Sequence, residues 1–148
     1  LAICEWAAEQ APSLWPKEPL VRAQARALAS EMHAGFGAVR RDMSMNVRRR
    51  LAAEPSWPED TRTDLTQLFA TWSHALEKSG GPFLFGQRSI ADAMFAPVAT
   101  RLRTYKVTVP APAQAYCDAI FADAAFQDWE CAAEAETWVI QTAEDLYR

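Results

Sequence analysis

Glycine and cysteine are scarce in this sequence, and it has no long uncharged apolar run. Five glycines and three cysteines occur among 148 residues. The cysteines include no CxxC pair, so we expect mostly buried thiols in a reducing compartment. No run reaches the roughly 18 apolar residues of a membrane span, and Glu5 and Glu9 interrupt the first apolar segment, which argues against a secretory signal. We therefore expect a cytoplasmic protein with no membrane partner; the cysteines are Cys4, Cys117 and Cys131.

Catalytic motifs are also missing. The sequence contains no GxGxxG, P-loop, HExxH or GxSxG pattern and no zinc-ligand spacing. The two histidines, His33 and His74, lie beside core positions of different predicted helices, which is typical of partly buried or surface side chains. The residues alone therefore predict no catalytic residue and no metal.

The composition favours helix, and the charge is unevenly distributed. Alanine supplies 29 residues and arginine 12 of the 15 cationic ones, and both are strong helix formers. The net charge of −4 disfavours a nucleic-acid partner. Residues 40–50 nevertheless carry five arginines and one aspartate, whereas residues 118–148 carry eight acids and one arginine.

Apolar spacing predicts a series of amphipathic helices. Leu28, Met32, Phe36, Val39 and Met43 recur every three or four residues, which predicts one long helix over about 20–43. The same spacing predicts further helices, and the only stretch with strand character is too short to build a sheet. We therefore expect an all-α domain. The other expected helices cover 65–76 (stopped by Ser79-Gly80-Gly81-Pro82) and a stretch starting at Ser89, and two or three shorter helices are expected over 113–123 and roughly 125–147 together. The strand-like stretch is 107–109.

The start of the helix after Ser89 has a specific capping signal. Ser89 falls at the N-cap and Asp92 at the third helical position, which is close to a capping box. We expect these two residues to fix the start of the helix and to affect folding more than chemistry.

The arginine run over 40–50 has three interpretations. The first is favourable placement at the negative end of the long helix together with solvation. The second is an anion-binding rim for a carboxylate or a similar group. The third, nucleic-acid binding, is disfavoured because no aromatic residues interleave with the arginines.

Four segments carry a further signal, in this order: LAICEW with APSLWP, EMHAGFGAVRRDM, GPFLFGQRSIADAMFAPV, and TYKV with PAPAQAY. Together they resemble the C-terminal helical domain of the cytosolic glutathione transferases, in a bacterial, loosely zeta-like form. LAICEW and the APSLWP connector resemble the last helix of a thioredoxin-like domain and its linker. EMHAGFGAVRRDM resembles the end of the long first helix of the helical domain. GPFLFGQRSIADAMFAPV, with its glycine turn, Ser-x-x-Asp cap and internal proline, resembles the most characteristic stretch. TYKV followed by PAPAQAY resembles the passage into the next helix.

This resemblance implies a division of the chain. Residues 1–10 correspond to the last helix of the thioredoxin-like N-terminal domain, residues 11–19 to the interdomain linker, and residues 20–148 to the all-helical domain, a helical bundle. It implies that most of the thioredoxin-like domain lies before Leu1. In the family that domain holds glutathione and supplies the thiolate-stabilising residue, so we expect no catalytic residue in this chain.

The resemblance also implies a substrate-binding region. In the family the end of the first helix of the helical domain forms one wall of the electrophile pocket. Arg41, Ser44, Met45 and Arg48 are the counterparts here, with Met45 as an adaptable apolar wall and Arg48 as an anion contact. The alternative is that these side chains only pack or face solvent. The carboxylate-binding arginine of zeta-class relatives falls at Thr104, so Arg101 and Arg103 are offset from it.

Three functions follow as hypotheses. The first is a homodimeric glutathione transferase that uses glutathione as co-substrate, conjugates it to a small electrophile and needs no metal. The alternative is a non-enzymatic interaction module, because similar helical domains occur in translation factors and synthetase complexes. The third, suggested by the arginine run, is a glutathione-dependent isomerase or dehalogenase acting on a carboxylate.

Overall fold

The computed structural model describes residues 1–145 and 147, and helices dominate this part of the chain. No strand occurs among these residues, although an isolated bridge pairs Phe83 with Gly86. The prediction of an all-α fold is therefore confirmed. None of the described helices is long and apolar enough to cross a membrane. The elements are α1 (Ala2–Gln10), the 3₁₀ turn η1 (Pro12–Leu14), α2 (Pro19–Ala34), α3 (Gly37–Asp42), α4 (Glu59–Ser79), α5 (Ile90–Thr104), α6 (Ala111–Ala122), α7 (Ala124–Ala135) and α8 (Gln141–Glu144).

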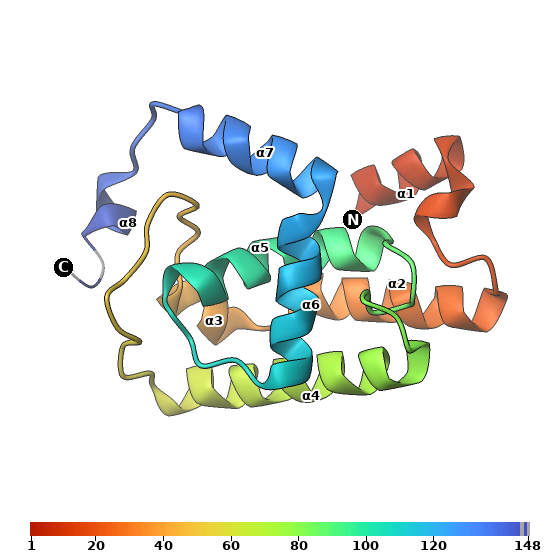
Figure 1. Ribbon diagram of the computed structural model, residues 1–148, viewed down its shortest axis with the longest axis horizontal. Coiled ribbons are helices and arrows are strands. Elements are labelled where there is room, and N and C mark those ends of the chain that lie inside the picture. Colours follow the sequence, from red (N-terminus) through yellow and green to blue (C-terminus); the bar gives the residue numbers. More distant parts are fainter. Residues whose placement is uncertain (146, 148) are drawn as a thin grey trace.

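The helices pack as a bundle in which α2, α4 and α5 run along the length of the molecule and α6 crosses them (Figure 1). Helix α5 packs against α2 and α6, α3 packs against α4, and α6 also contacts α4 and α7. Helices α1 and α7 lie along the upper edge in this view, and α8 lies near the C-terminal end.

The core is centred on Trp72 of α4, which is completely buried. Its ring meets the rings of Phe95 on α5 and Tyr116 on α6 edge to face, with centroids 5.5 and 4.8 Å apart. The ring of Phe36 extends the cluster, because its centroid lies 6.4 Å from that of the Phe95 ring. Aromatic edges and faces attract one another electrostatically, so this cluster joins three helices at defined angles.

The prediction of one continuous helix over residues 20–43 is wrong. Helix α2 ends at Ala34, and α3 begins at Gly37, after two intervening residues. Phe36 adopts a left-handed conformation, with φ of 53°, that no helix continues through. A Cβ at Gly35 would lie 2.8 Å from the carbonyl oxygen of Glu31, so a glycine is required here. The apolar spacing persists across the break because Phe36 stays buried, and periodicity alone therefore does not reveal it.

The other predicted helices are confirmed. Helix α4 contains residues 65–76 and ends at Ser79, and the Gly80 that follows has a left-handed φ of 64°. Helix α5 has Ser89 as its N-cap and continues through Pro97, and α6 covers most of 113–123. The stretch from 125 contains α7 and α8, with Leu146 and Arg148 outside the described residues.

Asp92 sits at the centre of a buried polar cluster at the start of α5. Its carboxylate accepts from the backbone N–H groups of Ser89 and Leu84, at 2.8 and 3.1 Å. The hydroxyls of Ser89 and Tyr116 also donate to it, at 3.0 and 3.1 Å. Burial raises the pKa of Asp92, while these four donors act in the opposite direction. The capping box therefore also fastens the loop before α5 and helix α6 to the start of α5.

Residues 43–58 form a long non-helical connection that crosses the end of α5. The hydroxyl of Thr104 donates to the carbonyl of Asn46 at 2.7 Å, and the N–H of Leu51 donates to the carbonyl of Thr104 at 2.8 Å. Glu54 accepts from the indole of Trp57 and from both donors of Thr108, at 2.8 to 2.9 Å. These bonds hold the connection in one conformation. They give hydrogen-bond partners to backbone groups that a helix would otherwise pair within itself.

Candidate functional site

The first part of this connection, residues 43–50, carries most of the residues expected to line the electrophile pocket. The hydroxyl of Ser44 lies 3.0 Å from that of Tyr105, which in turn donates to the carbonyl of Ser44 at 3.1 Å. The sulfur of Met45 lies 3.7 Å from Nη1 of Arg101. Ser44 and Met45 are both partly buried and lie against the end of α5. Their roles as substrate contacts remain predictions.

Arg48 holds the C-terminal segment. Its guanidinium donates to the carbonyls of Glu136 and Trp138, at 2.6 and 3.1 Å. Arg49 donates to the carbonyls of Glu144 and Tyr147, and Asn46 donates to the carboxylate of Glu144 at 2.7 Å. A shallow cavity of about 450 Å³ lies at this junction. The C-terminal segment therefore covers one side of the 43–50 loop, and Arg48 and Arg49 together hold it there.

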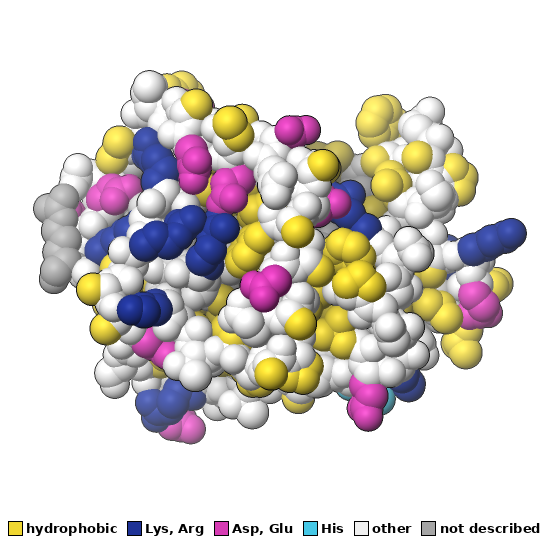
Figure 2. Space-filling model, in the orientation of Figure 1, with side chains coloured by type: hydrophobic (Ala, Val, Ile, Leu, Met, Phe, Trp, Pro, Cys, Tyr) yellow, Lys and Arg dark blue, Asp and Glu magenta, His cyan; other side chains and the backbone are white. Residues whose placement is uncertain are grey.

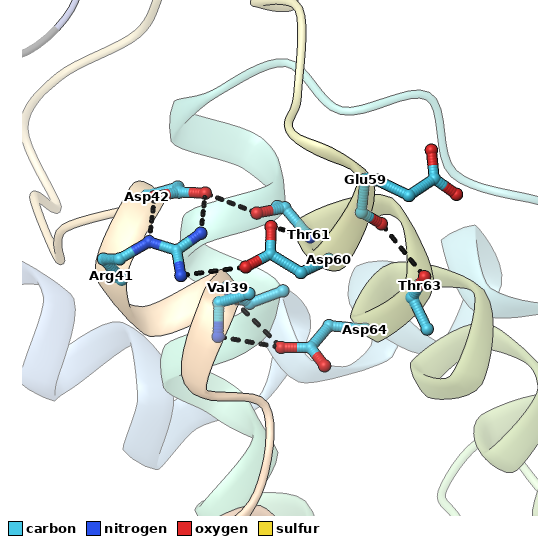
Figure 3. A network of polar contacts seen from close by, with 9 residues as sticks. Val39, Arg41, Asp42, Glu59, Asp60, Thr61, Thr63 and Asp64 are labelled. Carbon is cyan, nitrogen blue, oxygen red and sulfur yellow. Dashed lines mark hydrogen bonds and ion pairs between the residues drawn. The ribbon is translucent and has the colours of Figure 1, made fainter.

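Arg41 belongs to a different network, at the start of α4 (Figure 3). It donates two bonds to Asp42, at 2.7 and 2.8 Å, and one to Asp60 at 2.9 Å. Thr61 donates to Asp42 as well, and Asp64 accepts from the first amides of α3. Two carboxylates thus already neutralise Arg41, and no hydrogen bond or ion pair among the described residues joins it to Ser44, Met45 or Arg48. Its role in substrate binding remains a prediction.

This network makes stability pH-dependent. The hydrogen bonds from Arg41 lower the pKa of Asp42 and of Asp60 below their usual 3.8. A carboxyl with a lowered folded pKa stabilises the fold above its unfolded pKa, and this contribution is lost as the pH falls through the folded pKa. We expect Arg41→Gln to be less stable than the parent at pH 7, and the difference to shrink below about pH 4. Urea unfolding at several pH values measures this. A difference that is constant with pH would contradict the assignment.

A second basic cluster lies between α7 and the end of α5. Arg50 and Arg103 share the carboxylate of Glu130, and the guanidinium carbon of Arg103 lies 4.1 Å from the centroid of the Phe121 ring. Figure 2 shows Lys and Arg side chains gathered on this part of the surface, with acidic side chains at the edge. The arginine run is therefore divided. Arg40 and Arg41 lie in the last turn of α3, whereas 48–50 lie beyond any helix, so the helix-dipole interpretation applies only to the first pair.

The three cysteines differ in how far they are buried. Cys117 is buried, and this burial raises the pKa of its thiol to about 12. Cys4 is partly buried and Cys131 is exposed, so the expectation of mostly buried thiols is wrong for Cys131. Both histidines are exposed. Across residues 1–145 and 147, no three His, Cys, Asp or Glu side chains group as a metal site would require.

Two residues at the loop were not predicted as functional. Tyr105 is completely buried, yet its hydroxyl reaches Ser44. Arg101 donates to the carbonyl of Met43 at 2.7 Å. Sequence spacing does not reveal these partners, because they lie 58 to 61 positions away in the chain. The nearest signal in the sequence is that the carboxylate-binding arginine of zeta-class relatives falls at Thr104, three residues beyond Arg101.

The fold is an all-helical domain, and a comparison with models of protein families identifies its class. Residues 22–135 match the family model described as "Glutathione S-transferase, C-terminal domain". This match covers well over half of the chain, and the chain therefore belongs to that family. A search of curated protein sequences found no match.

Proposed function

We propose that this chain is the helical part of a glutathione transferase and that its 43–50 loop forms one wall of the electrophile pocket. The family match over residues 22–135 is the observation that carries the proposal. Glutathione is then a substrate, held by a thioredoxin-like domain, and the protein works as a cytoplasmic homodimer. Conjugation forms a sulfur–carbon bond from the glutathione thiolate, whose proton has left, while the leaving group departs with its electron pair. In this reaction the chain binds and orients the electrophile.

The proposed pocket wall combines apolar and polar groups. Met45 offers a flexible, polarizable side chain that adapts to ligands of different shape. Ser44 supplies a hydroxyl, Arg48 controls the C-terminal segment beside the loop, and Arg41 gives a charged edge beyond it. These are the four side chains that we propose to contact or enclose the electrophile.

The domain division is also part of the proposal. Helix α1 exposes Ile3 and Trp6, at 80% and 64%, although both are large and apolar. We propose that residues 1–10 are the last helix of the thioredoxin-like domain, whose other elements cover these side chains. Residues 11–19 are then the linker. The exposure of Ile3 and Trp6 equally favours the second candidate, an interaction module whose partner binds α1.

A kinetic comparison tests the transferase proposal. We expect the protein expressed from its complete gene to conjugate glutathione to 1-chloro-2,4-dinitrobenzene. Met45→Ala should raise the KM for this electrophile about three- to tenfold, as expected for lost apolar contact, and leave the KM for glutathione unchanged. Met94→Ala, which truncates a partly buried methionine on α5, is the matched control. Absence of conjugation would refute the transferase and leave the interaction module.

A further inference from the structure

A cavity of about 270 Å³ lies between the first half of α5 and the place where α6 turns into α7 (Figure 1). Most of the side chains that line it are apolar, and a few charged ones complete the lining, which is typical of sites for small molecules. None of the described residues that line it belongs to the 43–50 loop. The cavity is therefore separate from the proposed wall of the electrophile pocket.

The two walls of this cavity suit a flat ring. The α5 wall consists of small side chains, Ala93, Ala96 and Pro97, and these leave the space open. On the α7 wall Phe126 is buried, and its ring centroid lies 5.5 Å from that of Trp129, which is 43% exposed. Such rings attract further aromatic groups. An apolar cavity of about 150 Å³ holds one benzene ring, so this cavity has room for one or two fused rings.

The charged side chains at the cavity already have partners. Arg88 pairs with Asp123 at 3.0 Å, and Asp123 also accepts from the backbone N–H of Phe126 at 3.0 Å. The carboxylate of Asp92 accepts from four donors. A charged ligand would lose hydration here without meeting an unpaired opposite charge among the described lining residues, and this loss is costly. The cavity therefore favours an uncharged molecule.

One backbone acceptor beside the cavity lacks its regular donor. Pro97 lies inside α5 and has no N–H, so the helical hydrogen bond to the carbonyl of Ala93 cannot form. Ala93 and Pro97 both line the cavity. A donor on a bound molecule would supply the missing hydrogen bond, and a backbone carbonyl away from water gains from such a partner.

We propose that this cavity binds a flat, uncharged aromatic molecule of one or two rings that carries an N–H donor. The rings lie between the small side chains of α5 and the ring of Trp129, and the N–H donates to the carbonyl of Ala93. This proposal does not rest on the transferase function, because the four side chains of the proposed electrophile wall do not line the cavity.

Three naphthalene probes of similar shape separate the effect of charge from that of the donor. 2-Naphthamide is uncharged and has N–H groups, methyl 2-naphthoate is uncharged and has none, and 2-naphthoate is an anion. Calorimetry measures their dissociation constants on the protein expressed from its complete gene, with saturating S-(2,4-dinitrophenyl)glutathione to occupy the electrophile pocket. We expect the amide to bind most tightly. The ester should bind about three- to tenfold more weakly, because one hydrogen bond is lost, and the anion at least about tenfold more weakly than the ester.

Four variants assign this binding to the cavity. Pro97→Ala restores the N–H that bonds to the carbonyl of Ala93 and should abolish the preference for the amide over the ester. Ala96→Leu fills the space and should weaken both uncharged probes more than about tenfold. Trp129→Ala removes a partly exposed wall and should weaken both roughly tenfold; it tests the proposal even if Ala96→Leu does not fold. Trp138→Ala, at a side chain that is 83% exposed and outside the cavity, is the matched control and should alter neither.

The proposal is overturned if the amide does not bind, because the cavity is then closed in the complete protein. It is also overturned if Ala96→Leu and Trp129→Ala leave binding unchanged, since the probe then lies elsewhere. If Pro97→Ala leaves the preference for the amide intact, the carbonyl of Ala93 does not bind the donor and the stated ligand class is wrong. Absence of glutathione conjugation changes none of these results, so the two proposals fail separately.

Discussion

Replacing Asp92 with alanine should lower the free energy of unfolding by about 3 kcal/mol or more. The substitution leaves four donors without their acceptor, and each unsatisfied buried donor costs roughly 1–3 kcal/mol before relaxation. Asp92 is only 2% exposed, so water cannot readily replace the carboxylate. For a chain of this size the loss corresponds to a fall in Tm of roughly 6–12 °C. Thermal and urea unfolding measure it.

Two milder substitutions at the same cluster provide the control. Ser89→Ala removes the N-cap side chain and should cost about 1 kcal/mol. Tyr116→Phe removes one of the four donors, keeps the ring, and should also cost about 1 kcal/mol. If Asp92→Ala costs no more than these two, then the carboxylate is not the centre of the cluster.

Trp72→Ala should cost about 3–5 kcal/mol, because it empties the centre of the aromatic core. The indole N–H of Trp72 is buried and has no partner among the described residues. Trp72→Phe therefore keeps most of the ring contacts and removes an unsatisfied donor, and it should cost only roughly 1 kcal/mol. The two variants are compared by urea unfolding. If both variants lose the same free energy of unfolding, ring packing is not the main contribution of Trp72 to stability, and its indole N–H has a partner.

The sequence predicts the helices of this fold better than their boundaries. Apolar spacing and turn residues locate α4, α5 and α6, because each has one buried face and clear stops. The break between α2 and α3 escapes prediction, since Phe36 takes a left-handed conformation and yet remains in the buried stripe. A tertiary contact accompanies the break, because Asp64 of α4 accepts from the backbone N–H groups of Ala38 and Val39 in the first turn of α3.

The candidate site is less predictable than the fold. The chain position of Ser44, Met45 and Arg48 follows from the family resemblance, but their partners lie far away in sequence. Arg48 binds carbonyls 88 and 90 positions away, and Arg101 binds one 58 positions away. Local spacing carries no information on such contacts. The same limit explains why the arginine run is not one feature: Arg41 belongs to an ion network, Arg48 and Arg49 hold the C-terminal segment, and Arg50 pairs with Glu130.

Amide hydrogen exchange is the most direct test of the central claim that the 43–50 loop faces the electrophile. The protein expressed from its complete gene is compared with glutathione and with S-(2,4-dinitrophenyl)glutathione, which differ only in the electrophile-derived group. We predict slower exchange in residues 43–50 with the conjugate than with glutathione. Equal exchange of this loop in both complexes, with the difference located elsewhere in the helical domain, would contradict the assignment of the pocket wall.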